Sequence, residues 1–202
     1  MKKKLIVLAT LMAIVPSAFA ASGPQDIIPV PVKYEIFMEE YFPKVDGSDV
    51  RVHLGDKRFL KEINSLNIPE FARNEAYKLA VGKKGIDIFA VSEAGVYRAK
   101  TSLGMMMDKD SILMRCVILD YPRFRHRGLM LDISRNFRDK DFILKQLDAM
   151  AAVKMSTLHL HLTDDAGWRI QIDAYPELTR KAAWRVGRNF EEWRELGRQY
   201  SE

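Results

Sequence analysis

Two stretches decide the fold that this sequence predicts: RGLMLDISR, residues 127–135, and HLHLTDDAGWR, residues 159–169. Each is a short apolar run ending in charged residues, which is typical of a buried strand whose carboxyl end carries polar chemistry. Between them, Asp139 can cap a helix with a single apolar stripe. That stripe consists of Phe142, Ile143, Leu147, Met150 and Ala151. The sequence therefore predicts a parallel β-α-β unit with a right-handed crossover.

The region upstream of this unit predicts a small layer of strands and helix. Residues 77–81 and 86–90 each alternate in hydropathy, and the turn residues Gly82-Lys83-Lys84-Gly85 lie between them, which indicates a β-hairpin. Ser92 is a suitable cap for the helix expected next. Its apolar positions at helical spacing are Val96, Ala99, Leu103 and Met107. Strands covered on one face by a helix make an α+β domain.

Tyr121-Pro122-Arg123 marks the expected domain boundary, because proline ends the preceding pattern and the composition then changes. We therefore expect an α+β domain over residues 21–121 and a second domain, built of strand-helix units, over residues 122–202. The polar and aromatic tail from Glu191 is expected to be helical or frayed.

The first 20 residues are typical of a secretory signal. Lys2-Lys3-Lys4 supplies a positive start, residues 5–15 an apolar core, and Ser17-Ala18-Phe19-Ala20 a small-residue cleavage site. We expect export to the periplasm or the extracellular space. The apolar run is shorter than the roughly 20 residues that span a bilayer, so no membrane anchor is expected in the mature chain.

The charge pattern argues against a nucleic-acid-binding protein, and the cysteine count argues against a fold held by internal disulfides. The formal net charge of +5 includes three lysines from the signal, and the mature part interleaves basic with acidic residues. A nucleic-acid-binding protein needs a clustered basic face, so no nucleic-acid partner is expected. Cys116 is the single cysteine and allows no internal disulfide, but a chain with 48% hydrophobic residues can build a conventional core.

Arg135 lies just beyond the first apolar run, where a parallel strand would deliver it to the open edge of a sheet. Its guanidinium presents a rigid fork of donors, which suits two adjacent sugar hydroxyls as well as a carboxylate. A structural ion pair with Asp132 or Asp139 is the simpler interpretation from spacing alone. Arg127, at the entrance of the same strand, is expected to be structural.

His159 and His161 are two residues apart on the second run, so their imidazoles share a face and could bind a metal. A metal-dependent barrel hydrolase is therefore an alternative. Such a site needs further ligands from later strands, whereas His53 and His126 both lie upstream. Structural histidines are commoner than ligands in an isolated pair of this kind, and we assign no metal site.

The stretch TDDAGWR, residues 163–169, together with residues 127–135, resembles the opening of the catalytic barrel of family 20 glycoside hydrolases, the β-N-acetylhexosaminidases. A less specific match over residues 75–107 extends the resemblance to nearly all of the mature chain. It implies a (β/α)8 barrel after the α+β domain. It also implies retaining, substrate-assisted removal of terminal N-acetylglucosamine or N-acetylgalactosamine from glycans, with no metal or organic cofactor.

The resemblance also implies roles for single residues. Arg135 would hold the 3- and 4-hydroxyls of the terminal sugar, which makes substrate binding its better interpretation. Asp164 would join a polar network that supports the general acid, and nearby carboxylates keep such an acid protonated. His161 and Asp165 would orient the loop. Trp184 and Trp193 have no assigned role and are expected to be buried or half-buried.

The sequence departs from the family in one respect. The Asp-Glu pair that performs the chemistry comes from a later barrel strand, and we find no acceptable candidate for it here. A barrel needs about 250 residues, whereas about 80 follow the expected boundary. We therefore expect an N-terminal hexosaminidase fragment that is inactive alone. The remaining hypotheses are the metal-dependent hydrolase using His159 and His161, and a non-catalytic carbohydrate-binding protein.

Overall fold

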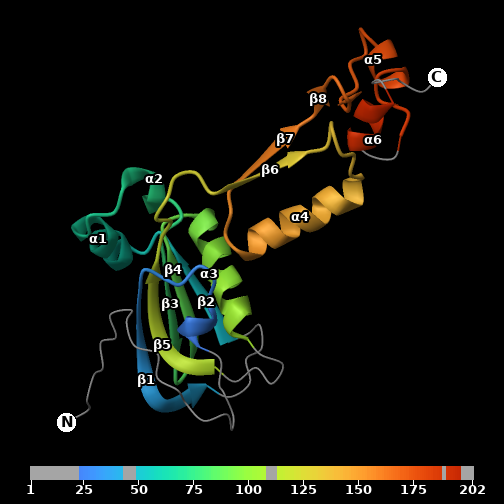
Figure 1. The fold of residues 1–202 in the computed structure, drawn as a ribbon. Coiled ribbons are helices and arrows are strands. Elements are labelled where there is room, and N and C mark those ends of the chain that lie inside the picture. The colour runs from blue at the N-terminus through green and yellow to red at the C-terminus, as the bar shows by residue number, and fades with distance from the viewer. Residues whose placement is uncertain (1–22, 43–48, 108–112, 188–189, 197–202) are drawn as a thin grey trace. The chain divides into compact units, whose positions relative to one another are not determined.

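The computed structural model describes residues 23–42, 49–107, 113–187 and 190–196 (Figure 1). The chain divides into two compact units, residues 1–125 and residues 126–202. The predicted signal over residues 1–20 lies outside the described residues.

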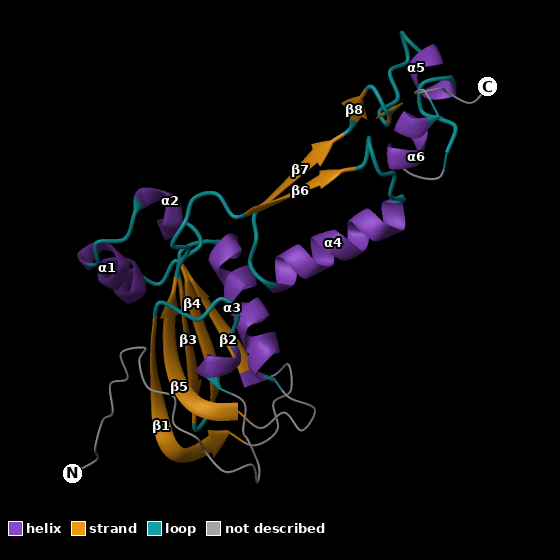
Figure 2. Ribbon diagram, viewed as in Figure 1, coloured by secondary structure: helices purple, strands orange, loops and turns teal. Residues whose placement is uncertain are grey.

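The first unit is built on a five-stranded sheet with the order β1-β5-β3-β4-β2 (Figure 2). Its strands are β1 (Lys33–Phe42), β2 (Val50–Leu54), β3 (Tyr77–Gly82), β4 (Gly85–Ala90) and β5 (Leu113–Asp120). The predicted hairpin is confirmed, because β3 and β4 pair antiparallel from Tyr77 with Ala90 to Gly82 with Gly85. Gly85 has a φ of +129°, and an added Cβ would lie 2.7 Å from the carbonyl oxygen of Asp49. The turn therefore requires glycine there.

Helix α3 (Glu93–Met106) packs on the face of this sheet that carries Leu79, Ile88 and Ile118. Ser92 caps it as predicted, since its side chain accepts a hydrogen bond from the backbone N–H of Ala94 at 3.1 Å. Met107, predicted on the buried stripe, is instead the exposed residue that follows the helix.

The described residues of the first unit also form three short helices. They are η1 (Pro24–Asp26), α1 (Lys57–Ser65) and α2 (Glu70–Arg73). Phe59 and Ile63 of α1 and Ala72 of α2 form a second buried cluster. This unit therefore has an apolar core of its own.

The second unit begins with the predicted β-α-β arrangement. Strand β6 (Gly128–Asp132) is followed by helix α4 (Lys140–Ala152) and strand β7 (Thr157–His161). The strands pair in parallel, with Asp132 opposite His161 at their carboxyl ends. Asp139 caps α4 by accepting a hydrogen bond from the backbone N–H of Phe142 at 2.8 Å. The parallel connection and the cap are confirmed.

Beyond β7 the chain forms a small antiparallel hairpin of β8 (Thr163–Asp164) and β9 (Gly167–Trp168). Helices α5 (Glu177–Arg180) and α6 (Phe190–Glu195) follow, the latter in the tail where a helix was expected. No periodicity in the sequence indicated the hairpin. It turns the chain immediately after β7, so that Asp164 comes to lie beside the end of β6.

The core of the second unit is small. Among the described residues after Arg125, the buried apolar side chains are Ile133, Met150, Ala166 and Trp193. Met150 is the buried member of the predicted α4 stripe, whereas Leu147 is 40% exposed. No helix within the described ranges is both long and apolar enough to cross a membrane.

Candidate functional site

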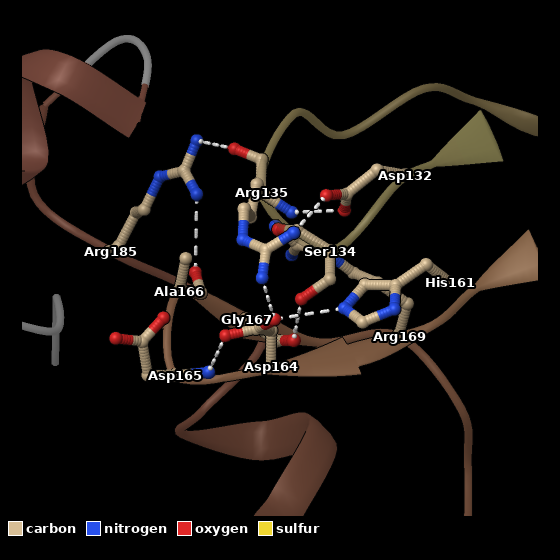
Figure 3. Close-up of polar contacts among 10 residues, drawn as sticks. All are labelled: Asp132, Ser134, Arg135, His161, Asp164, Asp165, Ala166, Gly167, Arg169 and Arg185. Carbon is tan, nitrogen blue, oxygen red and sulfur yellow. Dashed lines mark hydrogen bonds and ion pairs between the residues drawn. The ribbon is translucent and has the colours of Figure 1, made fainter.

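The site lies where β6 and β7 end. Parallel strands direct their carboxyl ends to one edge, so the paired residues Asp132 and His161 begin the site on neighbouring strands. Arg135 follows β6, and Asp164 lies in β8, directly after β7. Figure 3 shows the four side chains converging.

Arg135 lies between two carboxylates. Its backbone N–H donates to Oδ1 of Asp132 at 2.9 Å, and its Nη1 donates to Oδ2 of the same residue at 2.6 Å. Its Nη2 donates to Oδ2 of Asp164. Asp139 instead caps α4, so the ion pairs are with Asp132 and Asp164. The Arg135 side chain is still 43% exposed. Among the described contacts, two of the five guanidinium N–H groups are used in this way.

Asp164 is the most strongly hydrogen-bonded carboxylate of the group. Its Oδ2 lies 2.9 Å from Nε2 of His161, and its Oδ1 accepts from the backbone N–H of Asp165 at 2.7 Å. The contact with His161, then the Asp165 donors and the positive charge of Arg135, lower the pKa of Asp164 to about 2. Asp164 is therefore an anion at neutral pH.

Asp132 is also an anion. Burial raises the pKa of its carboxyl, but hydrogen bonds from the backbone and guanidinium of Arg135 outweigh burial, and the net shift is downward. The same interaction raises the pKa of Arg135. The site thus has a fixed cation between two fixed anions.

Two further arginines hold the backbone around the site, and the sequence analysis missed both roles. Arg169 donates to the carbonyl oxygens of Ile133 and Ser134 at 3.0 Å each, and to that of Ala183. Arg185 donates to the carbonyl oxygens of Ala166, at 3.2 Å, and Arg135. The available signals were the place of Arg169 at the end of the motif TDDAGWR, and the place of Arg185 in the apolar segment AAWRVG, residues 182–187.

A pocket of about 580 Å³ adjoins these arginines and is lined by Phe137, Trp168 and Trp184. Trp184 is 64% exposed, which makes the packing prediction wrong for this residue, whereas Trp193 is 1% exposed as expected. The indole N–H of Trp168 donates to the carbonyl oxygen of Ile170 at 2.7 Å, so this ring is tied to its own loop.

The two histidines of the predicted pair have different surroundings. His161 contacts Asp164, whereas His159 is exposed on β7 opposite Met130. Within the part of the chain that the structure describes, no group of three or more His, Cys, Asp or Glu side chains is arranged to hold a metal ion. Arg127 has the structural role predicted for it, because its Nε donates to the carbonyl oxygen of Lys154 at 3.0 Å.

The sequence of this region matches a known catalytic domain. The model of the glycosyl hydrolase family 20 catalytic domain matches residues 124–202. The N,N'-diacetylchitobiase of Vibrio harveyi is 47% identical over 116 residues, which are 56% of this chain and 13% of that protein. Beta-hexosaminidase B of Pseudoalteromonas piscicida is 44% identical over 110 residues, 54% of this chain and 14% of that protein. The chain thus spans about a seventh of the length of these curated relatives.

Solved structures of family 20 enzymes are also similar to this chain. A family 20 exo-β-N-acetylglucosaminidase from Vibrio harveyi, solved in complex with N-acetylglucosamine, matches with a TM-score of 0.66 and 27% identity over 92% of this chain and 31% of that one. A chitobiase from Flavobacterium johnsoniae matches with a TM-score of 0.63 and 28% identity over 86% of this chain and 32% of that one. Residues 124–202 of this chain therefore belong to the catalytic domain of glycosyl hydrolase family 20. Its relatives of this family are β-N-acetylhexosaminidases and chitobiases.

Proposed function

We propose that the protein carrying this sequence is an exo-β-N-acetylhexosaminidase that removes terminal N-acetylglucosamine or N-acetylgalactosamine from glycans. The observation that carries the proposal is the contact of Arg135 with Asp164, at the carboxyl ends of β6 and β7, inside the stretch that matches the family's catalytic domain. We further propose that β6, α4 and β7 begin a (β/α)8 barrel, whose active site lies at this edge.

Arg135 is proposed to bind the 3- and 4-hydroxyls of the terminal sugar. Two adjacent hydroxyl oxygens match the spacing of guanidinium donors. Asp132 and Asp164 hold the guanidinium from two sides, so little rotamer freedom is lost when the sugar binds. The 43% exposure of the side chain is consistent with an open ligand face.

The proposed reaction is substrate-assisted and retains configuration. The carbonyl oxygen of the sugar's acetamido group attacks the anomeric carbon, and the bond from that carbon to the leaving oxygen breaks. The leaving oxygen keeps the electron pair of the broken bond and accepts a proton from a carboxylic acid of the enzyme. Water then attacks the anomeric carbon, returns a proton to that carboxylate, and the acetamido group is restored.

This chain is proposed to supply substrate binding and electrostatic support rather than the acid. The sequence contains no Asp-Glu dipeptide, and family resemblance assigns the acid and the acetamido-orienting aspartate to such a pair. Asp164 is an anion held in place by His161 and the backbone of Asp165. A fixed negative charge near a carboxylic acid raises the pKa of that acid, which keeps it protonated near neutral pH.

Export to the periplasm or the extracellular space is part of the proposal. It rests on Lys2-Lys3-Lys4, the apolar residues 5–15 and the small residues before position 21. Glycans ending in N-acetylhexosamine are the proposed partners.

The test is hydrolysis of an aryl N-acetyl-β-glucosaminide by the complete gene product, or by residues 124–202 restored to an intact homologous barrel. We expect turnover, with the β-configured sugar as the first product detected by NMR. An α-configured first product would exclude retention. Absence of turnover on both the glucosaminide and the galactosaminide would exclude the proposed activity.

A further inference from the structure

The backbone just beyond β6 is held by side chains from further along the chain. Three consecutive carbonyl groups, those of Ile133, Ser134 and Arg135, accept hydrogen bonds from arginine side chains. The backbone N–H groups of Ile133 and Ser134 both donate to the carbonyl oxygen of His161 at 3.2 Å. The Ser134 hydroxyl donates to the carbonyl oxygen of Gly167 at 2.6 Å. Every peptide unit that leads into Arg135 is therefore anchored.

Arg185 makes the contact with the carbonyl group of Arg135. It comes from a segment without regular secondary structure between α5 and α6. One end of its guanidinium donates to the carbonyl oxygen of Arg135 and the other to that of Ala166 (Figure 3). Ala166 lies in the turn between Asp164 and Gly167. Arg185 thus joins the backbone of the sugar-binding arginine to the turn that carries Asp164.

We propose that Arg185 is a positioning residue, which sets the place of the Arg135 guanidinium by holding the Arg135 carbonyl. The inference rests on the proposed function, because it assigns to Arg185 a part in recognising the sugar through Arg135. Arg185 itself is half-buried, and both of its described hydrogen bonds go to backbone oxygens. It therefore acts through another residue.

Sugar recognition by Arg135 tolerates only a small displacement of its guanidinium. Binding groups must stay within about half an ångström of the productive geometry, and displacement by about 1 Å can cost on the order of a hundredfold in rate. Asp132 and Asp164 fix the far end of the Arg135 side chain, but Asp132 is the last residue of β6 and Asp164 the last of β8, so both lie next to the turns that must be held. A guanidinium that forms two hydrogen bonds at fixed angles can hold two backbone segments in a fixed relative position.

The first measurement compares two substrates, an aryl N-acetyl-β-glucosaminide and its analogue lacking the 4-hydroxyl. Wild type should prefer the parent sugar, because Arg135 contacts that hydroxyl. In the complete gene product, Arg185→Ala should lower kcat/KM for the parent about tenfold and for the deoxy sugar much less. Arg185→Lys, which keeps one donor, should recover part of the preference. Loss of folded enzyme alone would lower both values equally.

The control is Arg180→Ala. Arg180 is an arginine of the same unit whose described contact is with Glu177 on the exposed side of α5. Its removal should leave the preference unchanged. In a double-mutant cycle, Arg135→Ala with Arg185→Ala should show the same preference as Arg135→Ala alone, because Arg185 then has no guanidinium to position. A further loss of preference in the double variant would overturn the inference.

A second readout does not depend on turnover. The Nε–H signal of Arg135 in ¹⁵N NMR, assigned through Arg135→Lys, should be sharp in wild type and in Arg180→Ala. It should broaden or shift in Arg185→Ala. An inactive wild type with this pattern would overturn the proposed function and leave the positioning role supported. An unchanged signal in a folded Arg185→Ala would overturn the positioning role, whatever the activity.

Discussion

Oδ2 of Asp164 lies 2.9 Å from Nε2 of His161. His161 is the last residue of β7, and Asp164 belongs to the hairpin that follows it. This hydrogen bond is the largest cause of the low pKa of Asp164, about 2. The carboxylate is therefore ionised over the whole physiological range, and its charge is available to Arg135 and to any acid that approaches it.

The first prediction follows from that contact. In an NMR titration, the side-chain carboxyl carbon of Asp164 should report a pKa near 2. In His161→Ala the midpoint should move upward. It should not reach the ordinary aspartate value, because the Asp165 backbone N–H and Arg135 remain. A midpoint unchanged in His161→Ala would show that the Asp165 donors and Arg135 keep the pKa low without His161.

The low pKa of Asp164 also makes the stability of the folded state depend on pH. A carboxyl whose pKa is lower in the folded state stabilises that state above its unfolded pKa, and the contribution disappears as pH falls through the folded pKa. For Asp164 the loss falls between about pH 4 and about pH 2. Denaturant unfolding of Asp164→Asn over this range should show a weaker pH dependence than wild type.

The second prediction concerns Arg135→Ala in the complete enzyme. It removes charge-assisted hydrogen bonds to the sugar, each worth about 1.5–3 kcal/mol. The value of kcat/KM should fall on the order of 10²–10⁴-fold, through both KM and kcat. Arg135→Lys keeps the charge but not the planar fork and should recover little. Kinetic constants close to wild type in Arg135→Ala would leave only the ion pairs with Asp132 and Asp164 as its role.

The third prediction concerns Asp164→Asn, which keeps the size of the side chain and removes the charge. If Asp164 tunes a general acid, kcat should fall on the order of a hundredfold while KM changes little. The basic limb of the kcat profile against pH should also move to lower pH, since the acid would lose its proton more readily. A change in KM with an unchanged pH profile would make Asp164 a binding residue instead.

The fourth prediction separates the glycosidase from a metal-dependent hydrolase. A metal site would need both His159 and His161, whereas the structure brings only His161 to Asp164. His159→Ala should therefore retain activity close to wild type, and His161→Ala should lose much of it. Treatment with a chelator should leave activity unchanged. Inactivation by chelation with recovery on adding zinc would favour the metal-dependent class.

The fifth prediction concerns residues 21–202 expressed alone. This chain should show no glycosidase turnover, because its sequence contains no Asp-Glu dipeptide. Limited proteolysis should remove the second unit first and leave a core ending between Asp120 and Arg125. Few of the described residues in the second unit are both apolar and buried, and α4 exposes Leu144 and Leu147. Turnover, or a protease-resistant second unit, would contradict the respective half of this prediction.

Much of the fold was accessible from the sequence, because it depends on local periodicity. The alternation about Gly82 to Gly85 predicted the β3-β4 hairpin, and Asp139 predicted the start of α4. The polar end of the second apolar run pointed to Asp164. The β8-β9 hairpin was not predicted, because a strand of two residues has no period to detect. The exposure of Trp184 was also missed, since residue type alone favours burial.

From the sequence came the β3-β4 hairpin, helix α3, the parallel pairing of β6 with β7 across α4, and the motifs that resemble family 20 glycoside hydrolases. The sequence left the partner of Arg135 open between a sugar and a carboxylate. The tertiary structure was needed to show that Asp164 is the second partner of Arg135, and that Arg169 and Arg185 hold the backbone around it. The contacts of Arg169 and Arg185 join side chains to backbone carbonyl groups far along the chain. A carbonyl group is common to every residue, so no pattern of residue types can reveal which one an arginine will bind.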